Sequence, residues 1–554
     1  MFLMSRISLR GIFFTLLATL SLLYFMHFYG IIQSERVDIM VDKVSQVKIP
    51  WTSGTSIGDS FRNSELTLTN HKRQQAVRNA MQHAWTGYKT HAFGEDELQP
   101  ISKGGNVRWG DWAISLVDSL DTLKLMEMEE EYLEAKEFVR SMDFGRVTPG
   151  YMTQVFEMTI RALGGLLGAY ELDEDPMLLK KAREVADILA VAFEGSLVGL
   201  PASYVDVNMK KPVPAARVCI AEAGTIQLEF KKLSQLTGDP KYRKIAERAS
   251  DVLENATKYH SGLYPMYLNT VNGQYDHSAS LSMGAGADSF YEYQLKQYIL
   301  HDKAEEKYKD QYVASVEAVK AKLVAKSDSG LLYLGQWRNN MTVFVREMEH
   351  LACFYPGLMA LGAQVLDRPQ DLMISEELAR TCYLSYKTTA TGLGPETFSF
   401  SEPGQLPPAV DDITDDILPV PAPLGYPKIF QPNKYGITPI DTRYILRPET
   451  VESLFILYRV TDDPKYQEWG WDIFNAIEKH TKAEVGYAAY VNVHDVNSNG
   501  NWIDSMESFF MAETLKYLYL LFSPTDLISL DEFVLSTEAH PFRIIKNNET
   551  VLAD

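Results

Sequence analysis

The sequence predicts an all-α fold, a closed toroid of seven helical hairpins that belongs to the (α/α)7 barrel class. Three observations predict it: helical periodicity dominates from Lys72 onward, a helical hairpin recurs along the chain, and acidic residues lie inside otherwise apolar helices. Repeated helical hairpins form either an open solenoid or a closed toroid. A buried carboxylate without a partner is costly, so recurrent buried acids favour closure around a shared polar cavity.

The hairpin is visible as an internal sequence repeat. Segment 225–242 matches segment 451–466, and a third copy runs from Phe156 to the Asp-Pro pair that ends at Pro176. Proline after aspartate suits a turn, with the proline at the first position of the outgoing helix. We therefore expect a more charged second helix after each turn. These second helices are predicted at 177–193, 243–258 and 467–482.

Apolar first helices that carry acidic residues recur along most of the chain. One segment breaks the pattern: residues 401–440 hold nine prolines and cannot form a continuous helix. We interpret this proline-rich insertion as an ordered surface loop rather than a regulatory lid. The seven first helices are expected to begin near Trp112, Phe156, Glu222, Asp288, His350, Glu449 and Glu507.

The N-terminal segment predicts a membrane anchor. Residues 11–32 are apolar and uncharged and follow Arg6 and Arg10, so residues 1–10 should be a cytosolic tail and the remainder lumenal. A cleaved signal peptide is the alternative, but its apolar region is usually about 7–15 residues long. We expect a single-pass signal anchor, a polar stem at 33–70 and a catalytic barrel at 71–545.

Charge and cysteine content narrow the partners and the compartment. The formal charge of −20 argues against a nucleic-acid partner, because a phosphate backbone requires a basic face. The three cysteines, Cys219, Cys353 and Cys382, allow one disulfide in a lumenal protein, and their spacing does not choose the pair. Three glycosylation sequons agree with a lumenal location. They are Asn255, Asn340 and Asn548.

A ring of buried carboxylates suits glycoside hydrolysis. That reaction needs one protonated carboxyl group to release the leaving oxygen and one ionised carboxylate to activate water or attack. Burial and mutual repulsion separate the pKa values of such groups. Binding of divalent cations is the competing explanation, because carboxylates are also ligands of hard metals.

Six segments carry specific motifs in a fixed order, at 110–123, 159–167, 286–293, 350–354, 446–453 and 536–541. With these motifs the chain resembles the family 47 glycoside hydrolases, the class I α-1,2-mannosidases that trim high-mannose N-glycans. The resemblance covers about residues 72–542. It implies a calcium-dependent, inverting exo-hydrolase that acts on high-mannose N-glycans of glycoproteins in the Golgi or the endoplasmic reticulum.

The resemblance also assigns roles to individual residues. Glu157 matches the general acid, Glu449 the general base, and Asp288 a third essential carboxylate whose division of labour with Glu157 stays open. Thr537 matches a threonine that binds Ca²⁺ through its hydroxyl and carbonyl oxygens, with waters and sugar hydroxyls as the other ligands. Residues implied to surround the sugar or the calcium waters are Arg161, Glu222, His350, Glu396, Arg447, Glu452, Phe509, Glu513 and Glu538.

The resemblance implies a disulfide between Cys353 and Cys382, which leaves Cys219 free and buried. Asp118 and Asp121 lie in a matched motif, and we interpret both as structural.

Gly286 stands where members of the endoplasmic-reticulum type carry arginine, two residues before the essential aspartate. Loss of a long cationic side chain removes hydrogen bonds to one glycan branch and opens space. We therefore expect removal of several mannose residues, as in Golgi-type members. The alternative is a mannose-binding or weakly catalytic receptor for misfolded glycoproteins, and the presence of all three acids and Thr537 favours the enzyme.

Overall fold

The computed structural model describes residues 57–258, 260–401 and 433–546. The chain divides into two compact units, Met1–Lys72 and Arg73–Asp554. The described helix α3 (Ile57–His91) begins within the first unit, so the last part of the predicted stem is helical. No helix among the described residues is long and apolar enough to cross a membrane. The predicted tail and anchor, and most of insertion 401–440, lie outside the described residues.

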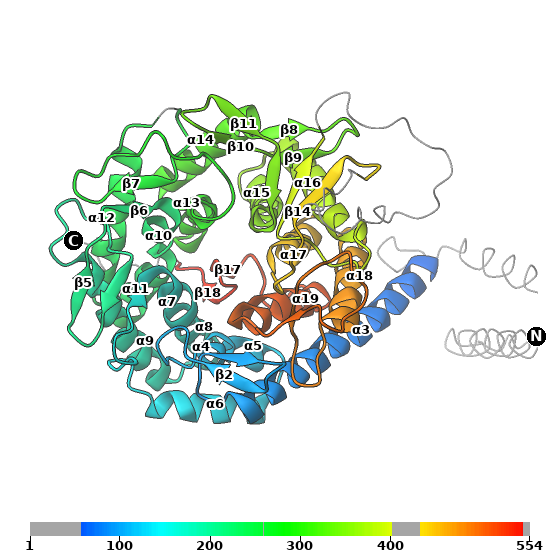
Figure 1. Cartoon of the computed structure of the whole chain (residues 1–554), viewed down its shortest axis with the longest axis horizontal. Coiled ribbons are helices and arrows are strands. Elements are labelled where there is room, and N and C mark those ends of the chain that lie inside the picture. Colours follow the sequence, from blue (N-terminus) through cyan, green and yellow to red (C-terminus); the bar gives the residue numbers. More distant parts are fainter. Residues whose placement is uncertain (1–56, 259, 402–432, 547–554) are drawn as a thin grey trace, which may run out of the picture. The chain divides into compact units, whose positions relative to one another are not determined.

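Within Arg73–Asp554, an inner ring of helices is surrounded by an outer ring (Figure 1). The inner helices are buried along nearly their whole length; in α13 every residue after Asp288 is buried. The inner positions are α4 (Ile114–Asp118) with α5 (Leu120–Leu125), α7 (Val155–Met158) with α8 (Gly164–Asp173), α10 (Ile220–Gly224) with α11 (Gln227–Thr237), α13 (Asp288–Leu300), α15 (Tyr355–Val365), α17 (Glu449–Thr461) and α19 (Leu515–Leu521).

The outer helices are more charged, as the repeat predicts. The (α/α)7 prediction is confirmed, with helix starts within a few residues of those expected. Besides α3, the outer helices are α6 (Glu129–Ser141), α9 (Pro176–Ala190) with the 3-10 turn η2 (Val191–Phe193), α12 (Lys241–Asn255), α14 (Glu306–Lys322), α16 (Pro369–Lys387) and α18 (Lys465–His480).

The ring closes between the start and the end of the unit. Arg73 of α3 forms a 2.8 Å ion pair with Glu468 of α18, and its guanidinium lies over the rings of Trp471 and Phe522. Among the described residues, which end at 546, no outer helix follows the seventh inner helix. Helix α3, which precedes the first hairpin, takes that place.

The aspartates of the three Asp-Pro turns act as caps. Asp175 accepts a hydrogen bond from the backbone N–H of Met177, and Pro176 is the first helical residue, as predicted. In the other two copies Asp239 and Asp463 accept from the backbone N–H groups that follow the proline. Each carboxylate satisfies one of the free N–H groups at a helix start.

Short antiparallel strands connect the helices, and several end where an inner helix begins, as β3 does before α7 and β6 before α10. The last hairpin, β17–β18, lies inside the ring (Figure 1). The paired strands are β1 (Glu97–Gln99) with β2 (Gly104–Asn106), β3 (Thr153–Gln154) with β4 (Tyr204–Asp206) and β5 (Lys211–Val213), β6 (Arg217–Cys219) with β7 (Tyr267–Asn269), β8 (Val324–Lys326) with β9 (Leu332–Leu334), β10 (Gln336–Arg338) with β11 (Val343–Val345), β12 (Glu347–Glu349) with β13 (Thr397–Phe400) and β14 (Ile437–Asp441), β15 (Ala489–Tyr490) with β16 (Trp502–Ile503), and β17 (Phe533–Leu535) with β18 (Pro541–Arg543).

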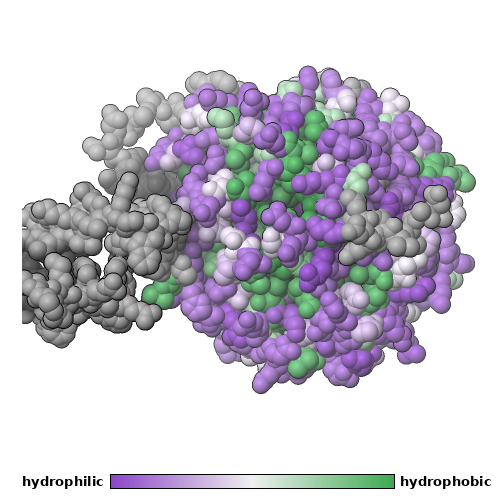
Figure 2. Space-filling model, turned by 180° about the vertical axis from the view of Figure 1, so that it is seen from behind, coloured by the Kyte–Doolittle hydropathy of each residue, from purple (hydrophilic) through white to green (hydrophobic). Residues whose placement is uncertain are grey.

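The surface is largely hydrophilic. Seen from behind, polar residues cover most of the face, and apolar residues gather near its middle (Figure 2). This polar exterior agrees with the formal charge of −20. The unusual concentration of charge lies inside the ring.

Candidate active site

The acidic residues of the site lie in the first turns of the inner helices. Asp288 and Glu449 are the first residues of α13 and α17, and Glu157 lies in the first turn of α7. Glu222 forms a capping box at the start of α10 with Cys219. A helix N-terminus carries partial positive charge and unpaired N–H groups, which favour a nearby carboxylate. The inner helices thus present their acids at the ends that help to hold negative charge.

These first turns surround a cavity of about 350 Å³. The volume falls in the range of pockets that hold small ligands. Its lining combines acidic, aromatic and arginine side chains with one threonine. The lining residues are Gln154, Phe156, Glu157, Ile160, Arg161, Cys219, Ala221, Glu222, Ala285, Gly286, Asp288, Ser289, Glu292, Leu351, Phe354, Arg447, Glu449, Glu452, Phe509, Glu513, Thr537 and Glu538.

All but two of the predicted site residues line this cavity. The exceptions are His350 and Glu396, each of which contacts a lining residue from behind. Glu396 forms a 2.7 Å ion pair with Arg447. The motifs therefore identified the cavity wall, and the structure divides the predicted set into residues that face the cavity and two that support it.

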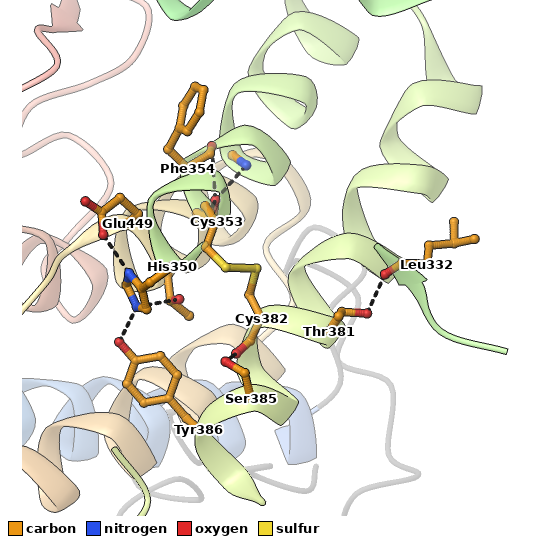
Figure 3. Close-up of a disulfide and its surroundings, with 12 residues drawn as sticks. Leu332, His350, Cys353, Phe354, Thr381, Cys382, Ser385, Tyr386 and Glu449 are labelled. Atoms are coloured by element: carbon orange, nitrogen blue, oxygen red, sulfur yellow. Dashed lines mark hydrogen bonds and ion pairs between the residues drawn. A yellow bond between two sulfur atoms is a disulfide. The ribbon is translucent and has the colours of Figure 1, made fainter. Parts of the chain in front are cut away.

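His350 holds Glu449 in place. Its Nδ1 lies 2.7 Å from Oε2 of Glu449, and its Nε2 lies 2.6 Å from the hydroxyl oxygen of Tyr386 (Figure 3). Burial alone would raise the pKa of Glu449, but the hydrogen bond and charge of His350, together with the charge of Arg447, lower it below its usual value. Glu449 is therefore an ionised carboxylate suited to accept a proton.

The disulfide joins the two segments that carry this histidine and tyrosine. Cys353 lies in the 3-10 turn η3 (His350–Phe354) and Cys382 in α16, with the two Cα atoms 5.9 Å apart (Figure 3). The implied pairing is confirmed. The covalent link fixes the position of His350 relative to Tyr386, and so supports Glu449 from behind.

Asp288 has the opposite electrostatic character. Burial, and to a lesser degree the charges of Glu349, Glu449 and Glu292, raise the pKa of Asp288 to about 7, against a hydrogen bond from the N–H of Ser289 that lowers it. One carboxyl group of the cavity therefore carries a proton near neutral pH while another stays ionised. Such a divergent pair is typical of acid–base catalysis.

Arg161 connects Glu157 to the last strand hairpin. Its Nε lies 2.8 Å from Oε2 of Glu157, and one terminal nitrogen lies 2.6 Å from Oε1 of Glu538. Arg161 belongs to a π-helical segment, η1 (Thr159–Leu163), and Glu513 to another, η4 (Phe510–Thr514). Such π segments are rare and occur preferentially at functional sites, and no periodicity argument predicts them.

The lining carries eight carboxylates against two guanidinium groups. Burial, and then repulsion from neighbouring carboxylates, raise the pKa values of Glu452, Glu513 and Glu538 well above the usual range. Thr537 adds hydroxyl and carbonyl oxygens, the ligand type that Ca²⁺ prefers. Among the described residues, no three His, Cys, Asp or Glu side chains are placed to hold a metal directly. These oxygen donors are of the kind that suits a calcium ion, with Thr537 as the residue that would hold it.

Two lining residues refine the sequence interpretation. Cys219 is free, as implied, but it is half-buried and lines the cavity instead of lying in the core. Gly286 has φ of +81°, and a Cβ there would lie 3.3 Å from Sδ of Met266.

Leu351 and Phe354 were not predicted, although their place beside His350 in a matched motif was a usable signal. Of the sequons, Asn255 and Asn340 are exposed, and Asn548 lies outside the described residues.

Comparison with known proteins agrees with this geometry. The profile of glycosyl hydrolase family 47 matches residues 80–544. An Arabidopsis thaliana mannosyl-oligosaccharide 1,2-alpha-mannosidase is 40% identical over 86% of this chain and 80% of its own length. The Homo sapiens endoplasmic reticulum enzyme of the same activity is 38% identical over 85% of this chain and 64% of its own length. The solved alpha-1,2-mannosidase of Trichoderma reesei is 31% identical, with a TM-score of 0.77, and covers 86% of this chain and 99% of its own.

Replacement of Asp288 tests its raised pKa through stability. Between pH 4 and pH 7 the folded protein binds a proton at Asp288 that the unfolded chain releases, so rising pH costs the wild type stability. Asp288→Asn removes this loss. We expect the variant to be more stable than the wild type at pH 8 by on the order of 1–3 kcal/mol, with the difference shrinking toward pH 4. Urea unfolding in the presence of chelator measures it; a difference independent of pH would contradict the assignment.

Proposed function

Because the chain belongs to glycosyl hydrolase family 47 and is a 1,2-α-mannosidase, we propose that it is calcium-dependent and inverting and that it removes several terminal mannose residues from each high-mannose N-glycan. One observation carries the mechanism: within one cavity, burial raises the pKa of Asp288 while His350 lowers that of Glu449. Inversion requires such a pair, a protonated acid at the leaving oxygen and an ionised base that activates water.

Glu449 is the base in this mechanism. His350 and Arg447 keep it ionised and hold it at the start of α17, so that its Oε1, which His350 does not contact, can accept a proton from the attacking water. Phe509 and Phe156 offer apolar faces to a sugar ring. Calcium, when bound at Thr537, supplies positive charge that orients sugar hydroxyls and water. Burial of Glu449 at the start of its inner helix strengthens these electrostatic interactions.

Glu157 and Asp288 are the two candidates for the general acid. Glu157 is held in an ion pair by Arg161, whereas burial raises the pKa of Asp288 to about 7, so we propose Asp288 as the group that delivers the proton. Asp288→Asn should then retain far more activity on an aryl mannoside, whose leaving group needs no proton, than on a mannose disaccharide. We expect Glu157→Gln to lose activity on both substrates to a similar extent. The opposite pattern in kcat would assign the acid role to Glu157.

The direct test follows mannose loss from a full-length high-mannose glycan by mass spectrometry, with calcium and with chelator. We expect calcium-dependent loss of several mannoses, and NMR of the first product should show the β anomer, as inversion requires. Glu449→Gln is the matched control and should lower kcat by at least roughly 10³-fold. Full activity in chelator refutes the calcium requirement. Glycan binding without release would indicate the alternative function, a mannose-binding receptor.

The number of mannoses removed should depend on Gly286. Because Gly286 lines the cavity without a side chain, no long cation reaches from this position toward one particular glycan branch. Gly286→Arg should reduce the number of mannoses removed per glycan, with kcat for the first preferred cleavage reduced less. Gly286→Ala is the control, because it introduces the same backbone strain at positive φ without the long cation. If both variants trim like the wild type, the open position does not set specificity.

We propose that the enzyme acts in the lumen of the endoplasmic reticulum or Golgi apparatus, anchored through residues 11–32. The disulfide between Cys353 and Cys382 supports this location, because disulfides persist in oxidising compartments. The exposed sequons also support it. Protease protection of the barrel in intact microsomes tests it, because a lumenal domain is cleaved only after detergent is added.

A further inference from the structure

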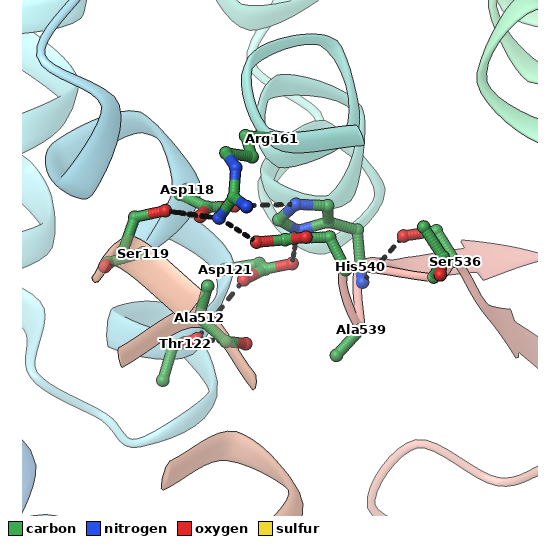
Figure 4. A network of polar contacts seen from close by, with 12 residues as sticks. Asp118, Ser119, Asp121, Thr122, Arg161, Ala512, Ser536, Ala539 and His540 are labelled. Carbon is green, nitrogen blue, oxygen red and sulfur yellow. Dashed lines mark hydrogen bonds and ion pairs between the residues drawn. The ribbon is translucent and has the colours of Figure 1, made fainter. Parts of the chain in front are cut away.

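The turn that carries Thr537 and Glu538 ends in a histidine that the proposed mechanism does not use. His540 is fully buried, and its Nδ1 lies 2.8 Å from Oδ2 of Asp121 while its Nε2 lies 3.2 Å from Oδ1 of Asp118 (Figure 4). Both aspartates are fully buried as well. The imidazole therefore joins the strand hairpin β17–β18 to the first inner position, which lies more than 400 residues earlier in the chain.

Helix α8 is shaped to admit this histidine. A Cβ at Gly164 would lie 2.6 Å from Cδ2 of His540, and a Cβ at Gly168 would lie 2.6 Å from Oδ2 of Asp121. Any side chain at either glycine would displace the imidazole or its partner. The histidine thus occupies a dedicated space between α8 and the first inner helices.

Lys516 makes a second attachment to the same turn. Its Nζ donates to the carbonyl oxygen of Ala539 at 2.9 Å and lies 2.8 Å from Oδ1 of Asp121. Asp121 therefore contacts both side chains that hold the turn. One is His540, which belongs to the turn, and the other is Lys516, which binds the carbonyl oxygen of Ala539. The turn is fixed at two points by one buried carboxylate.

Asp118 extends the cluster to the cavity. It accepts a hydrogen bond from the hydroxyl of Ser508, and that hydroxyl accepts one from Arg161 at 2.8 Å. Arg161 in turn binds Glu538 and Glu157. From the sequence we interpret Asp118 and Asp121 as structural. In the structure they contact the turn that carries Thr537, and through Ser508 Asp118 connects to Arg161, which pairs with Glu157.

We propose that His540 is a positioning residue: held between Asp118 and Asp121, it fixes the turn 536–540 so that the oxygens of Thr537 and the carboxylate of Glu538 face the cavity in the arrangement that binds a divalent cation. This inference rests on the proposed function, because calcium is the cation that the turn is proposed to bind. A histidine that only stabilised the fold would affect the melting temperature and leave calcium affinity unchanged.

Two substitutions each keep one of the two hydrogen bonds that the imidazole of His540 makes. The amide nitrogen of His540→Asn takes the place of Nδ1 and faces Asp121, whereas that of His540→Gln takes the place of Nε2 and reaches Asp118. His301→Asn is the matched control: His301 is similarly buried, hydrogen-bonds through Nδ1 to the carbonyl of Gln297, and lies at the opposite end of α13 from Asp288. Lys516→Met removes the contacts with Ala539 and Asp121 but keeps the imidazole, and it replaces the His540 variants if they do not fold.

Calcium affinity of the folded protein is measured by calorimetry, and kcat and KM on a mannose disaccharide are measured beside it. We expect the His540 variants to bind calcium at least tenfold more weakly, with His540→Gln closer to wild type because it keeps the arm toward Asp118 and Arg161. Lys516→Met should also weaken binding, whereas His301→Asn should lower only the melting temperature.

The positioning role is overturned if the folded His540 variants keep both calcium affinity and kcat within twofold of wild type. If those variants do not fold, the same result for Lys516→Met overturns it. If wild-type protein binds no calcium, the metal part of the proposed function fails separately. The role of His540 is then decided by kcat: a fall at unchanged KM, absent in His301→Asn, supports positioning through Arg161, and an unchanged kcat refutes it.

Discussion

The concentration of negative charge in one cavity is the constraint on which the rest of this structure depends. Eight carboxylates line about 350 Å³ beside two guanidinium groups. The fold tolerates this because first turns of inner helices surround the cavity, and because Arg161, Arg447 and His350 each contact an acid directly. Burial, and then the remaining repulsion between carboxylates, raise several carboxyl pKa values. Binding and catalysis would both use that unrelieved charge.

Three attachments between distant parts of the chain hold this charge in register. The disulfide joins η3 to α16 behind Glu449, and His540 joins the last strand hairpin to α4 and α5. Arg73 closes the ring between α3 and α18. Each lies outside the cavity and supports a residue or helix that forms its wall. A toroid suits this arrangement, because every inner helix has neighbours on both sides and few rigid-body movements remain open to it.

Much of the site was predictable because its residues lie in short motifs at helix starts, where sequence neighbours become spatial neighbours. Glu157 and Arg161, one turn apart, are such a pair, and their contact needs only the helix. The support of Glu449 by Tyr386 is different: it depends on packing between α16 and α17, for which no local pattern exists. The π segments at Arg161 and Glu513 were also missed, since a helical period does not reveal one extra residue per turn.

The sequence by itself determined the fold class and the hairpin turns, because apolar periodicity, Asp-Pro turns and buried acids are local signals that each helix carries alone. The resemblance of its motifs to a known family implied nearly all of the cavity wall. Only the tertiary structure decided which acid is protonated, that His350 and Glu396 stand behind the wall, that Cys219 faces the cavity, and that α3 completes the outer ring. Those properties arise from burial and from contacts between residues hundreds of positions apart, and electrostatic energy at such distances depends on geometry that no sequence period encodes.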